Sequence, residues 1–425
     1  MSGAALNGIE VIVIGAGAAG LGAAARLALA GVGVRIVEAR DRVGGRAHTL
    51  LDAPYPLDLG CGWLHSADRN PWTQIAAAAG LTIDKTVPPW TRQSMDLGFS
   101  RADQDAFERA SAAFHARLEA IDPSASDVAA ASLLEPGGRW NPLLDAESSF
   151  MNGAELDCVS AQDLCRYSDS GVNWRVREGY GALIAAQAAG LPLSLGCAVT
   201  LIDWRDRRPR VETTQGSLRA DAVIVTAPSS LIAAEAIRFR PELPDKVAAA
   251  SMLPLGLADK LVMTIAAPES LPADGHLFGD PNRTATASYH LRPFGRPLIE
   301  AFFGGRLAHD LEAAGPGAFF DFASAELAGL FGACIRARLR PLIETRWASD
   351  AFARGSYSYA LPGHADARAR LAAPVGGRLF FAGEACSQRA FTTAHGAYLT
   401  GLEAAEQVIL QHGAGSGSSQ ESITS

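Results

Sequence analysis

Residues 9–38, IEVIVIGAGAAGLGAAARLALAGVGVRIVE, form the stretch that decides the fold of this chain. Residues 9–14 are almost wholly apolar, which is typical of a strand buried on both faces. A glycine-rich turn follows, then an alanine- and leucine-rich segment with helical character, and residues 32–37 have the pattern of a second strand. The stretch therefore predicts a strand, a helix and a second parallel strand at the start of an α/β domain.

The turn has the spacing GxGxxG, and each glycine has a separate task. Gly15 makes the tight turn, Gly17 lets backbone approach a pyrophosphate, and Gly20 lets helix pack on strand. The N–H groups that begin the helix favour phosphate. Glu38 ends the second strand, where an acid can accept hydrogen bonds from ribose hydroxyls. A glycine-rich turn without a ligand is the alternative, and the acid and both strands favour the dinucleotide site.

The residues after this unit indicate which dinucleotide is bound. Arg42-Val-Gly44-Gly45-Arg46-Ala-His-Thr49 resembles the RxGGRxxT continuation of the flavin amine oxidase superfamily, which includes monoamine, polyamine and L-amino-acid oxidases and lysine-specific histone demethylases. By residue chemistry alone, the glycines allow close backbone approach and Arg46 is a cation that could face the cofactor, with a solvated basic loop as the alternative. The resemblance implies FAD, held by a Rossmann-type α/β domain that is combined with a discontinuous α+β substrate-binding domain.

Composition excludes other classes of protein. The chain has 425 residues, 48% hydrophobic and 19% charged, which indicates a globular protein with room for two or three domains. The net charge of −8 leaves no basic surplus for nucleic acid, and we expect the basic residues 207–210 to lie at a hairpin tip. The 6 cysteines are scattered without metal-ligand spacing, so we expect reduced thiols, no metal and a cytoplasmic location.

No membrane segment or cleaved signal is expected. The N-terminus lacks a basic region followed by an apolar one, and the first strand starts by Ile9. Residues 179–202 carry no charge, but Gln187, Gly190 and Pro192 interrupt them. We expect a helix there, then a turn at residues 190–192 and one strand over about 193–203.

The segment Asp58-Leu-Gly60-Cys61-Gly62-Trp63-Leu-His65 resembles the DxGxxWxHG segment of polyamine oxidases. Trp63 and His65 are two apart, so in an extended segment they share a face. The resemblance implies that this face lies toward the active site. From spacing alone, a core histidine beside a core tryptophan is the alternative.

Later segments alternate between two predicted domains. Helical patterns dominate residues 85–177, as in 102–121, and the family places such an insertion in its substrate domain. The expected FAD-binding domain comprises 1–84, 178–238 and 351–412, the expected substrate-binding domain comprises 85–177 and 239–350, and 413–425 is expected to be a disordered tail.

Lys260 opens an apolar strand in the segment Gly256-Leu-Ala-Asp-Lys260. From the pattern alone, a solvated lysine at a strand end is the alternative. The segment resembles the GxxxK strand of polyamine oxidases and demethylases, and this implies that Lys260 binds a water molecule facing flavin N5.

The segment from Trp347 to Tyr359 resembles the W-xx-D-x4-GSYS segment of the family. The resemblance implies that Trp347 covers the flavin and that Tyr357 forms one wall of an amine cage. Without it, aromatic residues bordering a strand are more often core. Ser356 stands where monoamine oxidases have the cysteine that attaches the flavin, so we expect FAD without a covalent bond.

The last segment completes the predicted cofactor site. Gly383-Glu384 at a strand end matches the family's second FAD fingerprint, and a helix is expected from Thr393, which can cap it, to about residue 410. Ala397 replaces the second cage tyrosine of monoamine oxidases, as in polyamine oxidases, which leaves room for a larger or longer amine.

The resemblance therefore implies two sets of site residues. The catalytic candidates are Lys260, Tyr357, Trp347 and His65. The cofactor-binding candidates are Gly15, Gly17, Ala18, Ala19, Gly20, Glu38, Ala39, Arg40, Gly44, Gly45, Arg46, Gly60, Cys61, Gly62, Trp63, Val199, Ala227, Trp347, Gly383, Glu384, Thr393, Ala394 and Ala397.

The implied activity is FAD-dependent oxidation of a small-molecule amine. Hydride passes to flavin N5, the imine hydrolyses to an aldehyde or ketone, and O2 or another acceptor reoxidises the flavin, with H2O2 as the product from O2. A homodimer is considered. The alternatives are an L-amino-acid oxidase, whose substrate carboxylate needs an arginine such as Arg92, Arg166 or Arg175, a desaturase or porphyrinogen oxidase, and a flavoprotein that acts only as a binding scaffold.

Overall fold

The computed structural model describes residues 8–413. The chain divides into two compact units, which we call the first unit (residues 1–84, 168–253 and 366–425) and the second unit (residues 85–167 and 254–365). The tail expected over 413–425 lies outside the described residues except for Gly413, which ends the last helix.

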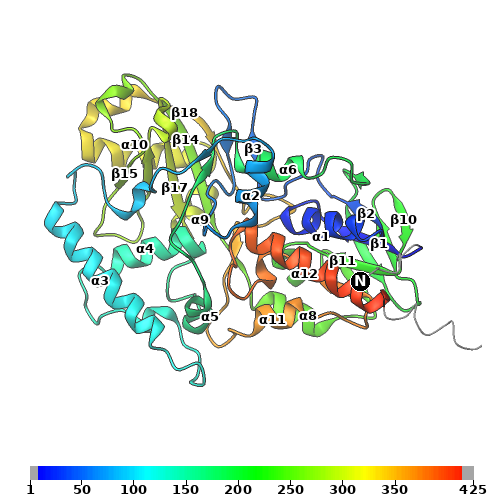
Figure 1. Ribbon diagram of the computed structural model, residues 1–425. Coiled ribbons are helices and arrows are strands. Elements are labelled where there is room, and N and C mark those ends of the chain that lie inside the picture. Colours follow the sequence, from blue (N-terminus) through cyan, green and yellow to red (C-terminus); the bar gives the residue numbers. More distant parts are fainter. Residues whose placement is uncertain (1–7, 414–425) are drawn as a thin grey trace, which may run out of the picture. The chain divides into compact units, whose positions relative to one another are not determined.

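A five-stranded parallel sheet, in the order β20-β11-β1-β2-β7, forms the centre of the first unit (Figure 1). In the middle strand, Val13 pairs with Ile36 on one side and Ile224 on the other, and all three are buried. This burial explains the apolar runs of the sequence. The strands are β1 (Glu10–Ile14), β2 (Gly33–Val37), β7 (Leu193–Ser194), β11 (Ala222–Val225) and β20 (Leu379–Phe381).

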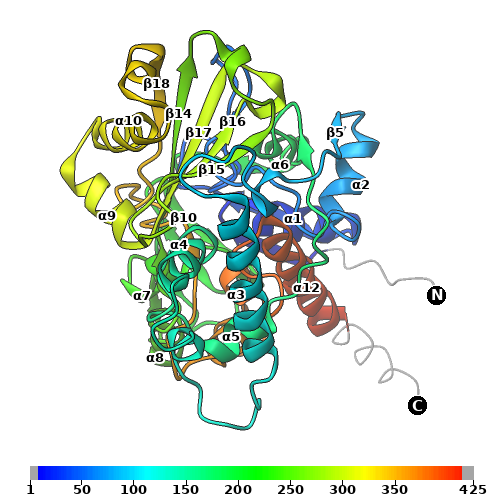
Figure 2. The same cartoon turned by 90° about the vertical axis from the view of Figure 1, so that its left-hand side faces the viewer.

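Two helices from opposite ends of the chain, α1 (Ala18–Leu29) and α12 (Ala394–Gly413), pack side by side in this unit (Figures 1 and 2). Glycines make the close approach necessary. A Cβ atom on Gly22 would lie 2.7 Å from the Tyr398 ring, and one on Gly401 would lie 2.1 Å from the carbonyl oxygen of Ala19. The two helices therefore fit only because these positions lack side chains.

The prediction of a single strand over residues 193–203 is wrong. The structure has two strands there, β7 in the five-stranded sheet and β8 (Val199–Asp203) in a second sheet of order β10-β9-β8-β12. Gly196, with φ +62°, lies in the turn between them. The other strands of the second sheet are β9 (Arg210–Thr213), β10 (Gly216–Arg219) and β12 (Arg238–Arg240).

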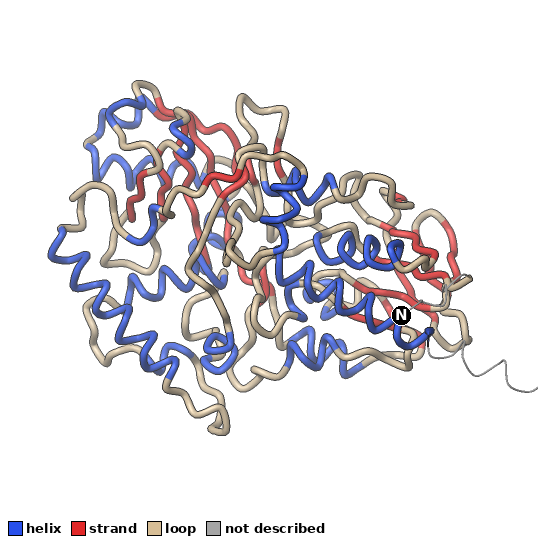
Figure 3. The backbone as a smooth tube through the Cα atoms, in the orientation of Figure 1, coloured by secondary structure: helices blue, strands red, loops and turns tan. Residues whose placement is uncertain are grey.

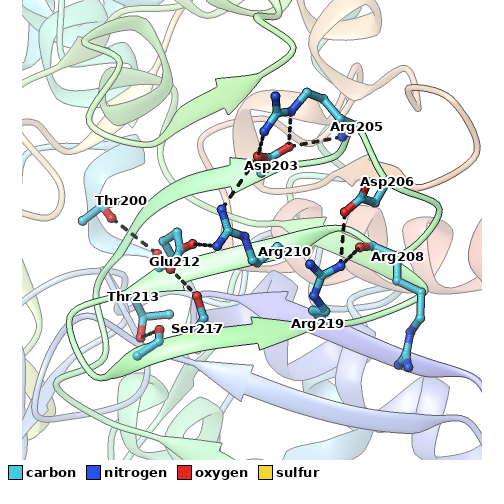
Figure 4. Close-up of polar contacts among 11 residues, drawn as sticks. Thr200, Asp203, Arg205, Asp206, Arg208, Arg210, Glu212, Thr213, Ser217 and Arg219 are labelled. Carbon is cyan, nitrogen blue, oxygen red and sulfur yellow. Dashed lines mark hydrogen bonds and ion pairs between the residues drawn. The ribbon is translucent and has the colours of Figure 1, made fainter.

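Residues 204–209 connect the antiparallel strands β8 and β9, and Arg210 begins β9, which confirms that the basic residues lie at a hairpin. Figure 4 shows that the arginines around it pair with carboxylates. Arg205 Nη2 lies 2.7 Å from Asp203 Oδ2, and Arg210 Nη1 lies 2.9 Å from Glu212 Oε1. The arginine side chains of these pairs are exposed, whereas Asp203 is buried and Glu212 is half-buried.

The remaining elements of the first unit surround the two sheets. They are β3 (Thr49–Leu50), β4 (Leu57–Asp58), β5 (Ile83–Asp84), β6 (Arg175–Val176), α2 (Pro71–Ala78), α6 (Tyr180–Ala186), α7 (Ser229–Ala233), α8 (Pro244–Ser251), α11 (Ala367–Ala372) and the 3₁₀ turn Glu384–Cys386.

The second unit is built on an antiparallel sheet of order β15-β16-β17-β14-β18, whose strands are red in Figure 3. Side chains from β14 and β17 form a buried core with α10, including Leu261, Phe303 and Phe319. The expected helix over 102–121 is α3, which Ser100 caps through the N–H of Asp103. The strands are β14 (Ala258–Ile265), β15 (Gly275–Phe278), β16 (Ser288–Leu291), β17 (Leu298–Gly304) and β18 (Leu339–Glu344). The helices are α3 (Arg101–Glu119), α4 (Asn141–Asn152), α5 (Ala161–Arg166), α9 (Gly305–Ala314) and α10 (Ala318–Phe331).

The unit boundaries differ from the expected domain boundaries at three places, each because of strand or helix pairing. Residues 168–177 join the first unit, where β6 pairs with β5. Residues 239–253 also join it, since α8 packs on α7 and α11. Residues 351–365 join the second unit, because β19 (Tyr357–Ser358) pairs with β13 (Leu255–Gly256).

Over the described range 8–413, no helix is both long enough and apolar enough to cross a bilayer.

Candidate active site

The first unit contains a glycine turn with open space above it. A Cβ atom on Gly20 would lie 1.9 Å from the carbonyl oxygen of Gly15, so the helix and the turn are in direct contact. A Cβ atom on Gly17 would meet nothing closer than Gly44 O at 3.9 Å. Helix α1 begins without a side-chain cap. Its first N–H groups are therefore available to an anion above Gly17.

Glu38 closes one side of this turn. It is buried after β2, and its two carboxylate oxygens accept hydrogen bonds from the backbone N–H groups of Ala16 (2.7 Å) and Arg40 (2.9 Å). These bonds fix the carboxylate beside the glycine turn while each oxygen keeps a second lone pair. Ala39 and Arg40 follow it directly in the chain.

An ion pair joins two sequence-predicted fingerprints that are far apart in the chain. Arg46 Nη1 lies 2.9 Å from Glu384 Oε1, and Glu384 Oε2 accepts a hydrogen bond from the N–H of Thr392 at 3.1 Å. Glu384 is buried and Arg46 is mostly so. This ion pair therefore holds the Gly44-Gly45-Arg46 turn against the Gly383-Glu384 turn.

Thr393 caps the start of α12. Its hydroxyl donates to the carbonyl of Ala390 at 2.7 Å and accepts from the N–H of Gly396 at 3.0 Å. The positive end of the helix dipole lies at this turn, which carries Ala394 and Ala397.

An antiparallel bridge joins Leu64 to Trp174. The residues on either side of Leu64, Trp63 and His65, contact the residues on either side of Trp174. The Trp63 ring lies 4.9 Å from the Arg175 guanidinium carbon, and His65 Nδ1 lies 2.7 Å from Asn173 Oδ1. Burial lowers the pKa of His65, although the Asn173 bond opposes this.

His395, in the first turn of α12, lies near the predicted site residue His65 and was not among the residues predicted from the sequence. Burial, and then the nearby His65, lower the pKa of His395 to about 4. Both imidazoles are therefore neutral near pH 7 and lie close enough to influence each other. The segment Thr393-Ala-His395-Gly396 contained the signal, but nothing in the sequence related it to His65.

The other predicted cofactor residues of the first unit lie in loops or at element ends. Gly60, Cys61 and Gly62 follow β4, Val199 begins β8, and Ala227 lies two residues after β11.

In the second unit, Tyr357 is fixed by the end of α4. Its hydroxyl donates a hydrogen bond to the carbonyl of Phe150, one of the carbonyls that the last turn of a helix leaves without a partner. Burial raises the pKa of Tyr357 well above its usual range, so it remains protonated. Tyr357 also pairs across strands with Gly256.

Lys260 and Trp347 belong to the same hydrogen-bonded assembly. The N–H of Lys260 donates to Thr345 Oγ1 and the N–H of Thr345 donates to Lys260 O, both at 2.8 Å. The N–H of Trp347, a buried residue, donates to Asp259 Oδ1 at 3.1 Å. The Lys260 ammonium lies 5.2 Å from the centre of the Phe302 ring. Lys260 lies in β14 of the five-stranded sheet, Tyr357 lies in β19 of the two-stranded sheet, and Trp347 lies in the turn after β18, so three of the four catalytic candidates lie in the second unit.

The three arginines considered for a substrate carboxylate already have partners. Arg92 pairs with Asp105, Arg166 donates to the carbonyl of Ala365, and Arg175 Nη2 lies 2.6 Å from Asp84 Oδ2.

Comparisons with known proteins give one consistent result. A family model described as flavin containing amine oxidoreductase matches residues 18–409. Polyamine oxidase 2 of Arabidopsis thaliana is 30% identical over 93% of this chain and 87% of its own length. Polyamine oxidase 3 of Oryza sativa subsp. japonica is 31% identical, over 94% and 88%. Among solved structures, cyclohexylamine oxidase from Brevibacterium oxydans IH-35A is similar with a TM-score of 0.77 at 20% identity, covering 95% of this chain and 99% of that one, which supports the two-domain α/β fold.

Proposed function

This chain belongs to the family of flavin-containing amine oxidoreductases and uses FAD, and we propose that its substrate is an extended amine of the polyamine class. The observation that carries the proposal is the neutral, half-buried Tyr357, whose neighbour Ser356 is hydrogen-bonded to the strand of Lys260, the same strand to which Trp347 is bonded. Ala397 supports it further, because alanine is smaller than the second cage tyrosine of monoamine oxidases. The curated relatives named as polyamine oxidases agree with this substrate class.

The residues of the first unit fit FAD. The open space above Gly17 and the uncapped start of α1 suit a pyrophosphate, and Glu38 suits ribose hydroxyls. When bound, FAD accepts a hydride from the carbon next to the amine nitrogen. The dipole of α12, whose first turn Thr393 caps, favours negative charge on a group bound at that end.

Tyr357 and Trp347 prepare the amine for oxidation. A protonated nitrogen cannot release hydride from the adjacent carbon, so the amine must first lose its proton. An aromatic, desolvated surface disfavours the charged amine and lowers its pKa. Because the pKa of Tyr357 is raised by burial, the phenol stays neutral and offers no negative charge that would hold an ammonium.

We assign proton transfer to Lys260 and orientation to His65. A lysine ammonium can bind a water molecule that carries protons in and out of the site. His65 is neutral, and the contact of its Nδ1 with Asn173 fixes the orientation of the imidazole ring. The imine product hydrolyses to an aldehyde or ketone.

We propose that FAD is bound without a covalent link. Ser356 stands at the attachment position, and its hydroxyl donates to the carbonyl of Ala258 and accepts from the N–H of Ala258. Denaturing the purified holoenzyme should release all flavin into the supernatant. Flavin that migrates with the polypeptide would contradict this.

We further propose O2 as the acceptor, with release of H2O2, and a homodimer as the assembly. A peroxide assay coupled to amine oxidation and a measurement of mass in solution test these two points. A cytoplasmic location is also proposed, because none of the 6 cysteines, all of which lie within residues 8–413, forms a disulfide.

An anaerobic substrate panel tests the proposed function. The holoenzyme is mixed without O2 with spermine, putrescine, cyclohexylamine and the amino acid ornithine, and flavin absorbance is followed. We expect the longest amine to bleach the flavin fastest. Fastest bleaching by ornithine would instead indicate an L-amino-acid oxidase, which the engaged arginines do not favour.

A further inference from the structure

Two buried carboxylates in the second unit have no task in the chemistry above. Asp259 precedes Lys260 in β14 and is 1% exposed, and Glu312 of α9 is 6% exposed. Burial, and then the adjacent Glu312, raise the pKa of Asp259 to about 8 although hydrogen bonds to Thr345 and Trp347 oppose this. Neither carboxylate forms an ion pair with any cation in the described part of the chain.

The two oxygens of Asp259 have different surroundings. Oδ1 accepts hydrogen bonds from Thr345 Oγ1 at 2.7 Å and from the N–H of Trp347 at 3.1 Å. Oδ2 is buried, and no donor within residues 8–413 reaches it. The Glu312 carboxylate lies near enough to Asp259 to raise the pKa of Asp259 through its charge and through a side-chain hydrogen bond.

Glu312 is surrounded by donors. Its Oε1 accepts from the N–H of Ala348 at 2.9 Å, and its Oε2 accepts from the N–H and hydroxyl of Ser349 at 3.2 and 2.8 Å. Its main-chain carbonyl accepts from Arg346 at 2.6 Å. Glu312 therefore holds residues 346–349 through its acceptor oxygens.

We propose that Asp259 and Glu312 share one proton, carried on Asp259 Oδ2, and that this acid pair positions Trp347 against the strand of Lys260. Two carboxylates in hydrogen-bond contact need a proton between them. Only Asp259 Oδ2 has no donor of its own, so the proton resides there. Asp259 and Glu312 then clamp residues 345–349 from two sides, while Thr345 connects the same segment to Lys260.

The charges around the pair are few. Tyr357 of β19 is neutral and its pKa responds to Asp259. Glu344 of β18 lies 4.0 Å from Arg346, which is turned toward the Glu312 carbonyl. The residue opposite Asp259 in β17 is the apolar Phe303. Loss of the proton therefore leaves two repelling carboxylates, and the segment of Trp347 should loosen above the pKa of Asp259.

Amide substitutions test the assigned proton. Asparagine at 259 can present its NH2 to Glu312 and its oxygen to Thr345, so Asp259→Asn should lower kcat by less than about threefold and remove the alkaline fall of kcat. Glutamine at 312 must turn an NH2 toward the donors of residues 348 and 349. Glu312→Gln and Asp259→Ala should each lower kcat by about tenfold or more, with a smaller change in KM. Asp310→Asn, an exposed carboxylate of the same helix, is the matched control and should leave kcat and its pH profile unchanged.

A spectroscopic readout decides the question without turnover. The infrared spectrum of the holoenzyme at pH 7 should contain the C=O band of a buried protonated carboxylic acid, lost in Asp259→Asn and kept in Asp310→Asn. A spectrum that Asp259→Asn leaves unchanged would overturn the shared proton, even where Glu312→Gln fails to fold. Equal losses of kcat in Asp259→Asn and Asp259→Ala would overturn the positioning role. The positioning role depends on the proposed function, whereas the infrared test does not, so the two can fail separately.

Discussion

At the scale of single residues, Lys260 combines a charged side-chain tip with a backbone that hydrogen bonds hold in place. Its main chain is bonded to Thr345 in both directions, while its ammonium lies over the Phe302 ring. These hydrogen bonds involve only the backbone of Lys260, so a substitution that removes the ammonium leaves them in place. Functional effects can therefore be separated from structural ones here.

We predict that Lys260→Met keeps FAD bound and slows flavin reduction or reoxidation by about tenfold or more, which corresponds to about 1.4 kcal/mol. Methionine preserves the apolar stem and removes the ammonium that would hold water. Stopped-flow absorbance of the two half-reactions measures this. Lys85→Met, at an exposed lysine of the same unit, is the control, and equal rates in both variants would refute the role.

Tyr357→Phe separates the ring from the hydroxyl. The variant keeps the aromatic wall but leaves the Phe150 carbonyl without its donor, which should lower the free energy of unfolding by about 1 kcal/mol. We expect KM to change little, whereas Tyr357→Ala should raise it clearly. Denaturant unfolding and steady-state kinetics measure the two effects, and a large rise of KM in Tyr357→Phe would show that the hydroxyl itself binds substrate.

The sequence predicted these residues through motifs, but it could not predict their partners. The sequence could not predict that Trp63 and His65 contact residues 173–175. His65 and Asn173 are 108 positions apart, and no helix or strand periodicity relates them. Asp259 and Glu312 were missed for the same reason. An acid inside an apolar strand gives no sign of the second acid that shares its proton.

At the scale of elements, the contact between α1 and α12 depends on glycine. The sequence predicted both helices, and it placed Gly20 against the strand, but it gave no reason for Gly22 or Gly401. The neighbouring helix requires both glycines: a Cβ atom on Gly22 would clash with Tyr398, and a Cβ atom on Gly401 would clash with Ala19. The failed prediction of one strand over 193–203 has a similar origin, since only the two sheets determine where the strand divides.

Gly401→Ala should therefore weaken the holoenzyme. A Cβ atom 2.1 Å from the Ala19 carbonyl must push the helices apart, at a cost of about 1–3 kcal/mol, and FAD should dissociate more readily. Thermal unfolding and flavin retention on gel filtration measure this. Gly329→Ala in α10, where a Cβ atom would meet nothing within 4 Å, should instead be neutral or stabilising by up to about 1 kcal/mol. The same loss in both variants would contradict the packing argument.

At the scale of the whole molecule, buried histidines set the acid limit of stability. Burial, and then the neighbouring His290, lower the pKa of His276 to about 3, and His395 is similarly lowered to about 4. The unfolded chain binds these protons near pH 6.5 and the folded chain does not. Stability from each histidine is thus complete above about pH 6.5 and falls by up to about 1.4 kcal/mol per pH unit below it. The raised pKa of Asp259 has the opposite effect on stability. The folded chain keeps this proton up to about pH 8, whereas the unfolded chain loses it near pH 4, so the contribution of Asp259 to stability falls as the pH rises.

We expect the thermal midpoint of the holoenzyme to be highest near about pH 6.5 and to fall steeply toward pH 5. His276→Asn should make the acid side shallower. His115→Asn, at an exposed histidine of α3, should leave it unchanged. A slope that is the same in both variants would show that His276 does not contribute to the acid limit.

The domain pattern itself was predictable because apolar runs, glycine turns and capping residues are local signals. The exact boundaries were not, since residues 351–365 join the second unit only through the pairing of β19 with β13. Long-range pairing of this kind is set by the folded sheet rather than by the segment.

The contact of α1 with α12 also dictates an order of events during synthesis. Residues 18–29 leave the ribosome early, yet their partner helix and the Glu384 that pairs with Arg46 are made more than three hundred residues later. Until translation has nearly finished, the nascent chain exposes an apolar helix face without its cover. The complete pairing of both ends of the cofactor domain can therefore form only after residues 384–413 have been made.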